Sequence, residues 1–557
     1  MEYIAQVFGA FYQLVGNAGT RPSKPAFHCC IWLHLPNNSK PYLRQMLPQP
    51  FIQSLQQVKG FDQAAFEQVH QSGQQVTSIR LNPKKQEIRD RGQGAMVNGE
   101  RSMVNGEGSS IQHQGSNVNG EGSSIQHPAS SIQHPAPNPQ PPTSNLQHHT
   151  SNIIPPTSLP VPWCPHAYYL EQRPSFTLDP SFHAGAYYVQ EASSMFLWEA
   201  LRQTVGEAPS QTVLDLCAAP GGKSTLLSTY FQEGLVVSNE VIKSRANILV
   251  ENISKWGNDN VVVTNNDPQH FQQLPGFFDV LVVDAPCSGS GLFRKDPHAI
   301  DEWSEGNVQL CSQRQQRILG DVLPALKEGG VLIYSTCSYS PAEDEDIADW
   351  LVGEMHMESL PLQLQEDWNI VETISAQHKA HGYRFYPDKV KGEGLFIAAF
   401  RKTAPVEEKK LKELSLPWPS KREAEVLQTF MEWPLGYFLF KQGDCIRAMP
   451  QQWEQALKNL SAHLYIKKAG IGLGAVKGKD FVPEHELAVS ALSLTQMQSV
   501  ELSREQALQY LRRKELVVEA PKGWTLVKYD GWVLGWIKAL PNRINNYYPQ
   551  EWRILKA

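Results

Sequence analysis

Strand-like hydrophobic runs alternate with helical stretches through the middle of the chain. From residue 212 onward the runs are TVLDL, GLVVSNE, NVVVTNND, FDVLVVDAP, GGVLIYSTC and GLFIAAF. Near-continuous Val, Ile and Leu strands separated by helices are typical of a parallel sheet covered by helices on both faces. The pattern therefore predicts a doubly wound α/β domain over residues 183–402.

The regions on either side of this domain predict smaller α+β units. The N-terminal domain, 46–182, begins with two short amphipathic helices, and QQVTSIRLNP then alternates like a strand that ends at Pro83. Residues 403–424 form a charged linker. Residues 425–557 mix helices with short strands, and we expect a separable α+β module there. Residues 1–45 show no sustained period and are left as an unassigned N-terminal extension.

A low-complexity repeat interrupts the N-terminal domain at 87–158. The unit NGEGSSIQH occurs at 105–113 and again at 119–127. Each unit offers one Ile among polar residues, whereas solenoid repeats usually run about 20 residues or more and bury an apolar face. We therefore predict a disordered insertion. Repetition accounts for most of its histidines, which do not predict a metal site. They are His113, His127, His134, His148 and His149.

Composition narrows the class of protein. The 557 residues carry a net charge of −6 with 41% hydrophobic side chains, which excludes wholesale disorder and a histone-like polycation. Residues 401–557 hold 24 Lys and Arg against 17 Asp and Glu, a net charge of +7 that suits a polyanionic partner. The eight cysteines are scattered without a CxxC, and no stretch has the roughly 20 apolar residues of a membrane span. We expect a cytoplasmic protein with free thiols, no metal and no membrane association.

Ligands of open parallel sheets bind at the carboxyl ends of the strands, and small residues follow the first strand there. This loop contains Cys217, Ala218, Ala219, Pro220, Gly221, Gly222 and Lys223. It lets a ligand approach backbone N–H groups at a helix N-terminus. The second strand ends in Glu240, which suits ribose hydroxyls, and the third in Asp267 beside two asparagines. A P-loop would need glycine at Cys217, so the loop favours an adenosyl cofactor over a nucleoside triphosphate.

The next two strands end beside cysteines. The fourth ends at Asp284 and is followed by Cys287 and Lys295, while the fifth is followed by Cys337. A buried cysteine is usually only a small hydrophobic residue. Two of them at neighbouring strand ends on the cofactor edge form a much less common arrangement. The spacing therefore indicates thiol chemistry at this edge.

Four motifs together carry a resemblance to a known family. LDLCAAPGGKST, DAPCSGSG, FRKDP and STCSYSPAEDE resemble the RNA 5-methylcytosine methyltransferases of the Nop/Sun (Fmu) family, which use S-adenosylmethionine. The resemblance covers 183–402. Outside it, the start at Met46 with VTSIRLNP and the segment GWTLVKYDGWVLGWIKALPNRINNYYPQEWRI look like the bacterial RsmF branch, whereas residues 1–45 and 87–158 have no counterpart in that pattern. The resemblance implies a Rossmann-like methyltransferase domain, a PUA-like RNA-binding module, small-subunit ribosomal RNA as the partner, and a monomer.

The reaction of that family explains why two cysteines are needed. Carbon 5 of cytosine is a poor nucleophile, so a thiolate must add at carbon 6 before methyl transfer. In the family the cysteine of Thr-Cys attacks and that of Pro-Cys assists release, which implies Cys337 and Cys287 respectively. DNA cytosine methyltransferases attack with the Pro-Cys cysteine, so spacing alone leaves the roles open. Asp284 would bond the polar edge of cytosine, and Lys295 would lower a thiolate pKa.

Binding of the substrate requires that the target base be accessible. A stacked base hides carbons 5 and 6, so the target must be unpaired or flipped. Cations and aromatic side chains that suit phosphates and stacked bases alternate near the C-terminus. They are Lys538, Arg543, Tyr547, Tyr548, Trp552 and Arg553.

Two alternative functions remain. A noncatalytic RNA-binding or ribosome-assembly protein on the same fold would be expected to have a broken catalytic motif, and none is broken. A DNA methyltransferase is a further alternative, disfavoured by Cys337 after Thr336.

Overall fold

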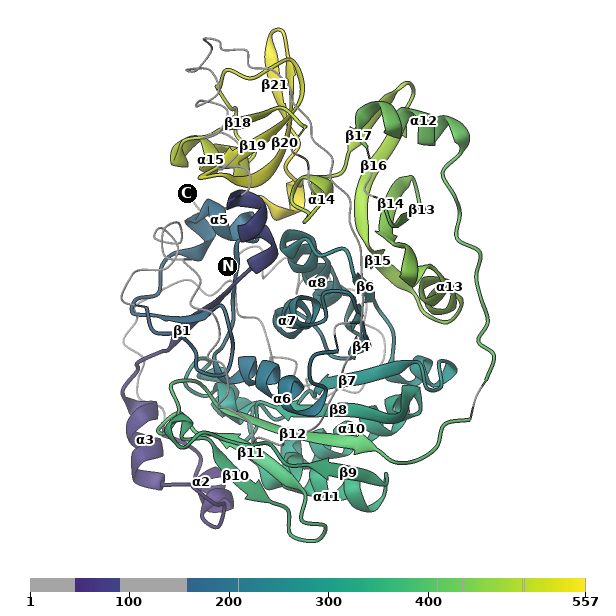
Figure 1. The fold of residues 1–557 in the computed structure, drawn as a ribbon. Coiled ribbons are helices and arrows are strands. Elements are labelled where there is room, and N and C mark those ends of the chain that lie inside the picture. The colour runs from purple at the N-terminus through teal and green to yellow at the C-terminus, as the bar shows by residue number, and fades with distance from the viewer. Residues whose placement is uncertain are drawn as a thin grey trace, which may run out of the picture.

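The computed structural model describes residues 46–90 and 158–555, except 209, 408, 433, 434, 493 and 495 (Figure 1). The N-terminal extension and the repeat units with their histidines lie outside the described residues. Three groups of elements are described: an N-terminal unit, a large central sheet with its helices, and two smaller sheets toward the C-terminus.

The central sheet confirms the doubly wound fold. In the described residues it has 10 strands, in the order β10-β11-β12-β8-β7-β4-β5-β6-β15 with β9 beside β12. Its parallel strands are those expected from the hydrophobic runs: β4 (Thr212–Asp215), β5 (Leu235–Asn239), β6 (Val261–Thr264), β7 (Phe278–Asp284) and β8 (Leu326–Thr336). The remaining strands of its antiparallel end are β9 (Met357–Leu360), β10 (Val371–Ile374), β11 (His381–Phe385) and β12 (Leu395–Lys402).

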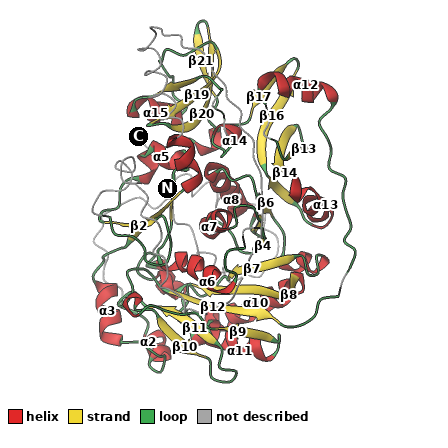
Figure 2. Ribbon diagram, viewed as in Figure 1, coloured by secondary structure: helices red, strands yellow, loops and turns green. Residues whose placement is uncertain are grey.

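Alternate side chains of the parallel strands belong to two separate cores, one on each face. Figure 2 shows these strands together with the helices around them. Val213 belongs to the same core as Leu249 of α8, whereas Leu214 belongs to the same core as Leu319 of α10. Both faces are therefore buried, which is why these strands are hydrophobic at nearly every position. The covering helices are α6 (Leu197–Thr204), α7 (Gly222–Tyr230), α8 (Lys243–Trp256), α10 (Glu305–Val322) and α11 (Glu345–Gly353).

One strand runs against the expectation of a parallel sheet. The last hydrophobic run, GLFIAAF, forms β12, which is antiparallel to β8 with Phe396 opposite Thr336. The chain enters β12 directly from its antiparallel neighbour β11, without a crossover helix between them. Two neighbouring strands that are consecutive in the chain can be parallel only if a crossover connects them, so β12 runs antiparallel to β11.

The N-terminal unit has the expected helices and strand. They are α2 (Gln49–Leu55), α3 (Gln63–Gln71) and β1 (Thr77–Leu81), with β1 between β2 (Ala167–Leu170) and β3 (Tyr187–Val189). The predicted start of the insertion at residue 87 is wrong, because residues 83–90 are helical. Arg89 in this helix pairs with Asp530 at 3.1 Å and lies 4.7 Å from the ring centroid of Trp532. These contacts hold the helix against the C-terminal part of the chain.

The C-terminal residues form two sheets instead of one module. The first contains β13 (Tyr437–Gln442), β14 (Cys445–Pro450), β16 (Ile471–Lys477) and β17 (Asp480–Pro483). The second contains β18 (Ser499–Glu501), β19 (Gly523–Tyr529), β20 (Trp532–Leu540) and β21 (Arg543–Asn546). Their main helices are α12 (Lys421–Phe430), α13 (Glu454–His463) and α15 (Arg504–Leu511), with two shorter ones, α5 (Pro180–His183) and α14 (His485–Ala488), near the second sheet.

The structure contradicts the expectation that residues 425–557 are separable. Strand β15 (Ile466–Ala469) pairs antiparallel with β6 and so extends the central sheet (Figure 1). Phe438 and Leu460 belong to the same buried core as α10. Removing this region would expose the edge of β6 and a large apolar surface to water, which would lower the stability of the central domain.

Candidate active site

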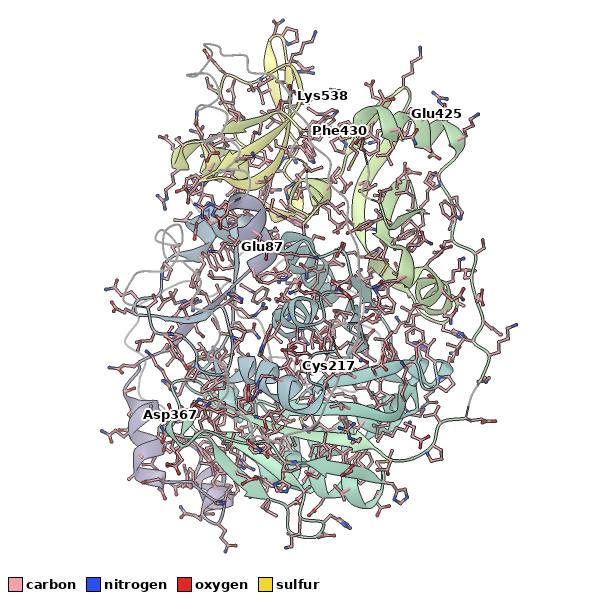
Figure 3. The ribbon with its side chains drawn as sticks, in the orientation of Figure 1. Glu87, Cys217, Asp367, Glu425, Phe430 and Lys538 are labelled. Atoms are coloured by element: carbon pink, nitrogen blue, oxygen red, sulfur yellow. The ribbon has the colours of Figure 1, made fainter. Side chains whose placement is uncertain are left out.

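The small-residue loop after β4 is held by helix α8. Asn252 donates a hydrogen bond to the carbonyl of Pro220 at 2.8 Å, and Arg245 donates one to the carbonyl of Ala219 at 2.7 Å. Gly221 has φ +118°, a conformation that L side chains rarely adopt, and a Cβ there would lie 3.2 Å from Leu249. The loop therefore keeps one shape at the start of α7; Cys217, which opens it, is labelled in Figure 3.

Carboxylates follow four neighbouring parallel strands at the same edge. Glu240 after β5 accepts the backbone N–H of Ile242 at 2.8 Å and lies 3.4 Å from Arg245. Burial raises the pKa of Glu240, while Arg245 and backbone N–H donors oppose that shift. Asp267 after β6 accepts the N–H of Gln269 at 3.2 Å, which caps a short helical turn. These acids stand at the positions where the sequence predicted ribose and adenine contacts.

Asp215 and Asp284 complete this row of acids. Asp284 after β7 pairs with Lys223 at 2.8 Å and accepts the hydroxyl of Ser335 at 2.8 Å. Asp215 at the end of β4 is fully buried and accepts the hydroxyl of Ser224 at 2.6 Å. Burial raises the pKa of Asp215 to about 7. Sequence reasoning missed Asp215, although an acid that ends the first strand of the sheet was the available signal.

The two predicted cysteines meet beyond β7 and β8. The Sγ atoms of Cys287 and Cys337 lie 3.0 Å apart, although the residues are 50 positions apart in sequence. Cys287 is buried, and Cys337 is partly exposed. Both thiols can therefore reach the same small region of space.

A cavity of about 150 Å³ joins the loop to the cysteine edge. The predicted residues that line it are Cys217, Ala218, Ala219, Pro220, Gly222, Lys223, Asp284, Lys295 and Cys337. Gly221, Glu240, Asp267 and Cys287 lie outside the set of lining residues. The N-terminal unit closes another side with Ser78, Tyr188, Gln190 and Glu191. The structure thus brings most of the predicted site together in one space.

The position of Lys295 differs from the simplest expectation. It lies 3.6 Å from Glu393, which also pairs with Arg294 at 3.3 Å. Burial lowers the pKa of Lys295, and Glu393 opposes the shift. Lys295 and Cys337 line the same cavity, while the cation paired with Asp284 is Lys223.

Arg80 is a further residue that sequence reasoning missed. It extends from β1, is almost fully buried, and donates hydrogen bonds to Thr225 at 2.6 Å and to the carbonyl of Gly222 at 3.3 Å. Gln190 accepts its Nε–H at 3.1 Å. Arg80 therefore ties the N-terminal unit to the first turn of α7. The sequence predicted the strand but gave no signal that Arg80 in it would be buried.

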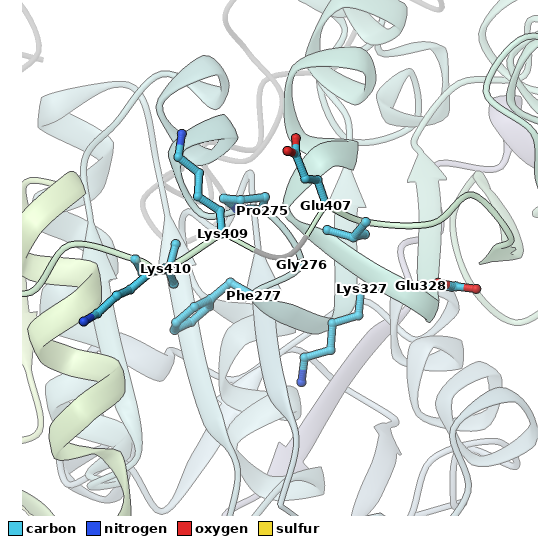
Figure 4. Close-up of a pocket in the computed structure, with 10 residues that line it drawn as sticks. Pro275, Gly276, Phe277, Lys327, Glu328, Glu407, Lys409 and Lys410 are labelled. Carbon is cyan, nitrogen blue, oxygen red and sulfur yellow. The ribbon is translucent and has the colours of Figure 1, made fainter.

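A larger hollow of about 740 Å³ lies elsewhere (Figure 4). It is lined by Phe277, which precedes β7, by Lys327 at the start of β8, and by linker residues 406, 407 and 409–411. These are the amino ends of the strands, opposite the edge that carries the cysteines. None of the predicted site residues lines this larger hollow. The smaller cavity is therefore the better candidate for the active site, although its volume is lower.

The proposed RNA-binding run near the C-terminus is only partly exposed. Tyr548 is fully buried against His485 and Tyr510, so its expected role in base stacking is wrong. Trp552 also packs on His485, at 5.2 Å between ring centroids. Trp532 and Trp536 of the neighbouring strand β20 are buried as well. The cations of the run, Lys538, Arg543 and Arg553, keep exposed surface; Lys538 lies 5.2 Å from the ring centroid of Trp524 and is labelled in Figure 3.

Among the described residues, no group of three or more His, Cys, Asp or Glu side chains could hold a metal ion. No described helix is long and apolar enough to cross a membrane.

The doubly wound sheet, the small-residue loop after its first strand and the acids at its carboxyl edge define a Rossmann-like, S-adenosylmethionine-dependent methyltransferase. The model of the 16S rRNA methyltransferase RsmB/F family matches residues 203–401. The models of the RsmF N-terminal domain and the RsmF PUA domain match 142–192 and 497–554. The chain belongs to the RsmB/F family of RNA methyltransferases.

Two relatives from other organisms agree with this assignment. The ribosomal RNA small subunit methyltransferase F of Shewanella loihica is 30% identical over 411 residues, covering 70% of this chain and 83% of the relative. That of Psychromonas ingrahamii is 32% identical over 413 residues, covering 70% and 84%. A methyltransferase homologue from Pyrococcus horikoshii has a solved structure with 24% identity and a TM-score of 0.42, covering 64% of this chain and 100% of that one.

If Glu240 accepts the ribose hydroxyls as the sequence predicts, Glu240→Gln is expected to weaken S-adenosylmethionine binding, because it removes the charge of that acceptor. The loss of one charge-assisted hydrogen bond is worth about 1.5 to 3 kcal/mol, or roughly 10- to 100-fold in Kd. Calorimetry measures it. The matched control is Asp279→Asn at the opposite edge, where Asp279 pairs with Lys327 at 2.6 Å. Equal affinity of the Glu240 variant and the wild type would contradict a ribose site here.

Asp215→Asn is expected to change the pH dependence of stability. The pKa of Asp215 is about 7 in the folded protein against an ordinary value of 3.8, so between these pH values the folded protein binds a proton that the unfolded chain has lost. The stabilisation is complete below pH 4 and is lost as pH rises toward 7, by at most about 1.4 kcal/mol per pH unit. Denaturant unfolding of both proteins from pH 4 to 7 measures the difference. Parallel stability curves would contradict a buried proton at Asp215.

Proposed function

We propose that this RNA methyltransferase transfers the methyl group to carbon 5 of a cytosine in small-subunit ribosomal RNA, through a covalent adduct with Cys337. The observation that carries the proposal is the 3.0 Å approach of two thiols at neighbouring strand ends, beside the cavity that holds the cofactor loop. S-adenosylmethionine, held by the 217–223 loop with Glu240, Asp267 and Asp284, supplies the methyl group. In this proposal the enzyme works as a cytoplasmic monomer.

The assignment of roles to the two cysteines follows from access. Cys337 lines the cavity where a flipped cytosine would lie, and Cys287 is buried behind it. The Sγ of Cys337 would therefore add to carbon 6, which makes carbon 5 nucleophilic. After methyl transfer, carbon 5 loses its proton and the carbon–sulfur bond breaks to return the thiolate. Cys287, 3.0 Å away, is placed to assist this release.

Asp284 and Lys295 are proposed to handle the base and the thiolate. Asp284 lines the cavity and already accepts two donors, Lys223 and Ser335. Its carboxylate would bind the polar edge of cytosine and favour the protonated ring, which increases attack at carbon 6. Lys295 lines the same cavity, and its positive charge would lower the pKa of a nearby thiol.

The proposed reaction can be tested on the RNA product. Small-subunit ribosomal RNA incubated with the protein and S-adenosylmethionine is expected to gain 5-methylcytosine. Nucleoside mass spectrometry identifies the modified base, and bisulfite sequencing locates it. RNA treated with Cys337→Ser is the control and is expected to stay unmodified. Methylation of a different base, or of the cytosine amino group, would contradict the proposal.

The cysteine variants separate attack from release. Cys287→Ala is expected to accumulate a covalent protein–RNA adduct because it forms the bond but releases slowly, whereas Cys337→Ala is expected to form none. Denaturing gels show the adduct as a shifted band. Cys311→Ala, a buried cysteine on α10, is the matched control and should behave as wild type. An adduct trapped by Cys337→Ala instead would reverse the two roles.

A further inference from the structure

A buried carboxylate, Glu343, lies between the two loops that carry the cysteines. One of its oxygens accepts the backbone N–H of Ser288 at 2.8 Å, and the other accepts the hydroxyl of Ser338 at 2.7 Å. The hydroxyl of Ser288 donates to it as well. Ser288 follows Cys287 and Ser338 follows Cys337. A single side chain is therefore hydrogen-bonded to the residue after each thiol.

Gln315 of α10 extends this contact to the other side of Cys287. Its amide nitrogen donates to Glu343 at 3.1 Å and to the carbonyl of Pro286 at 3.1 Å. Gln315 is fully buried. The residues on both sides of Cys287 are thus held, directly or through Gln315, by Glu343. We refer to Glu343, Gln315, Ser288 and Ser338 as the Glu343 cluster.

Cys337 is held on both sides in a similar way. The hydroxyl of Thr336, which precedes it, donates to Asp344 at 2.7 Å, and Ser338, which follows it, donates to Glu343. Asp344 in turn pairs with Arg384 at 3.0 Å. Two adjacent carboxylates, Glu343 and Asp344, thus fix the backbone around the proposed nucleophile. In the described contacts, Glu343 also bonds the Cys287 loop, whereas Asp344 does not.

The contacts place Glu343 outside the reaction itself. It is fully buried, does not line the cavity, and both of its oxygens accept hydrogen bonds from the two cysteine loops and from Gln315. Its carboxylate accepts four donors, which offset the cost of burying a charge and favour one geometry of the loops. An apolar side chain would avoid that cost but would connect neither loop.

We propose that Glu343 is a positioning residue that sets the separation of the Cys287 and Cys337 thiols and thereby makes release of the RNA adduct efficient. The proposal rests on the proposed cytosine-5 function for its catalytic consequence. Release needs a second group at the correct place beside the carbon–sulfur bond, and a misplacement of about 1 Å costs up to about 100-fold in rate. The Glu343 cluster is the structure that keeps both loops within that tolerance.

The first test measures thiol geometry without RNA. Diamide takes up the two thiol hydrogens of a close cysteine pair and leaves a disulfide, and its rate depends on how often the sulfurs meet. In the full-length protein, Glu343→Gln is expected to slow formation of the Cys287–Cys337 disulfide about 10-fold or more, because an amide cannot accept all four donors. Mass spectrometry of the linked peptides follows it.

The matched control is Asp349→Asn. Asp349 is a buried carboxylate on α11 that accepts hydrogen bonds from Ser375, from the N–H of Gln377 at 2.9 Å and from that of His378 at 2.7 Å. It bonds neither cysteine loop in the described contacts. This variant should oxidise at the wild-type rate. Equal slowing of both variants would overturn the proposal, since it would show general loosening.

The second test measures turnover. Glu343→Gln is expected to lower kcat about 10- to 100-fold with KM for RNA nearly unchanged, and to leave more covalent adduct at steady state. If Glu343→Gln does not fold, the double variant Ser288→Ala, Ser338→Ala decides, because it removes two donors and leaves the carboxylate in place. Wild-type rates of oxidation and release in the folded variant would overturn the proposal.

The outcomes also distinguish this inference from the proposed function. If the wild-type protein forms no RNA adduct, the covalent mechanism is wrong, and the oxidation rates still report whether Glu343 sets the thiol separation. If the adduct forms normally but the Glu343 variant oxidises and releases as wild type does, only the positioning role is wrong.

Discussion

The parallel pairing of β7 with β8 is the constraint on which the reactive edge depends. Asp284 lies opposite Ser335 in this register, so the next few residues of each strand leave the sheet side by side. Burial of Val and Leu side chains on both faces stabilises the pairing. Because parallel strands end at the same edge, two cysteines 50 residues apart reach a sulfur separation of 3.0 Å. No short-range interaction could produce that meeting.

The central domain is completed by segments from both ends of the chain. Arg80 of the N-terminal unit bonds the first turn of α7, and β1 and β3 close one side of the cavity. At the opposite end of the sheet, β15 covers the edge of β6 and prevents an exposed strand. The backbone of Tyr465, just before β15, also exchanges hydrogen bonds with Asn266 at the acidic edge. Segments from both ends of the described chain therefore contact the central domain, the N-terminal ones at the cavity and β15 at the edge of the sheet.

Several buried charges lie at the carboxyl edge and are held in pairs or networks. Lys223 pairs with Asp284, and Lys295 with Glu393, inside the cavity. Glu343 bonds neutral donors instead of a cation, which leaves the loops connected without adding a positive charge near the thiols. Such arrangements cost desolvation energy and are retained where geometry matters more than stability. At this edge, the buried charges therefore lower the stability of the fold but hold the side chains of the site in a fixed geometry.

The sequence by itself determined the parallel strands, the small-residue loop, the order of the acids and the two cysteines. These features are local, because the burial of a hydrophobic run and the conformation of a turn motif can be predicted from the residues of that segment alone. Tertiary structure alone decided which segments meet: the reversed β12, the docking of β15, the burial of Tyr548 and the helix at 83–90. Arg80 and Glu343 gained their roles in the same way, from partners far away in the chain. The physical reason is that a periodic pattern records that a side chain is buried, whereas its partner depends on how distant elements pack.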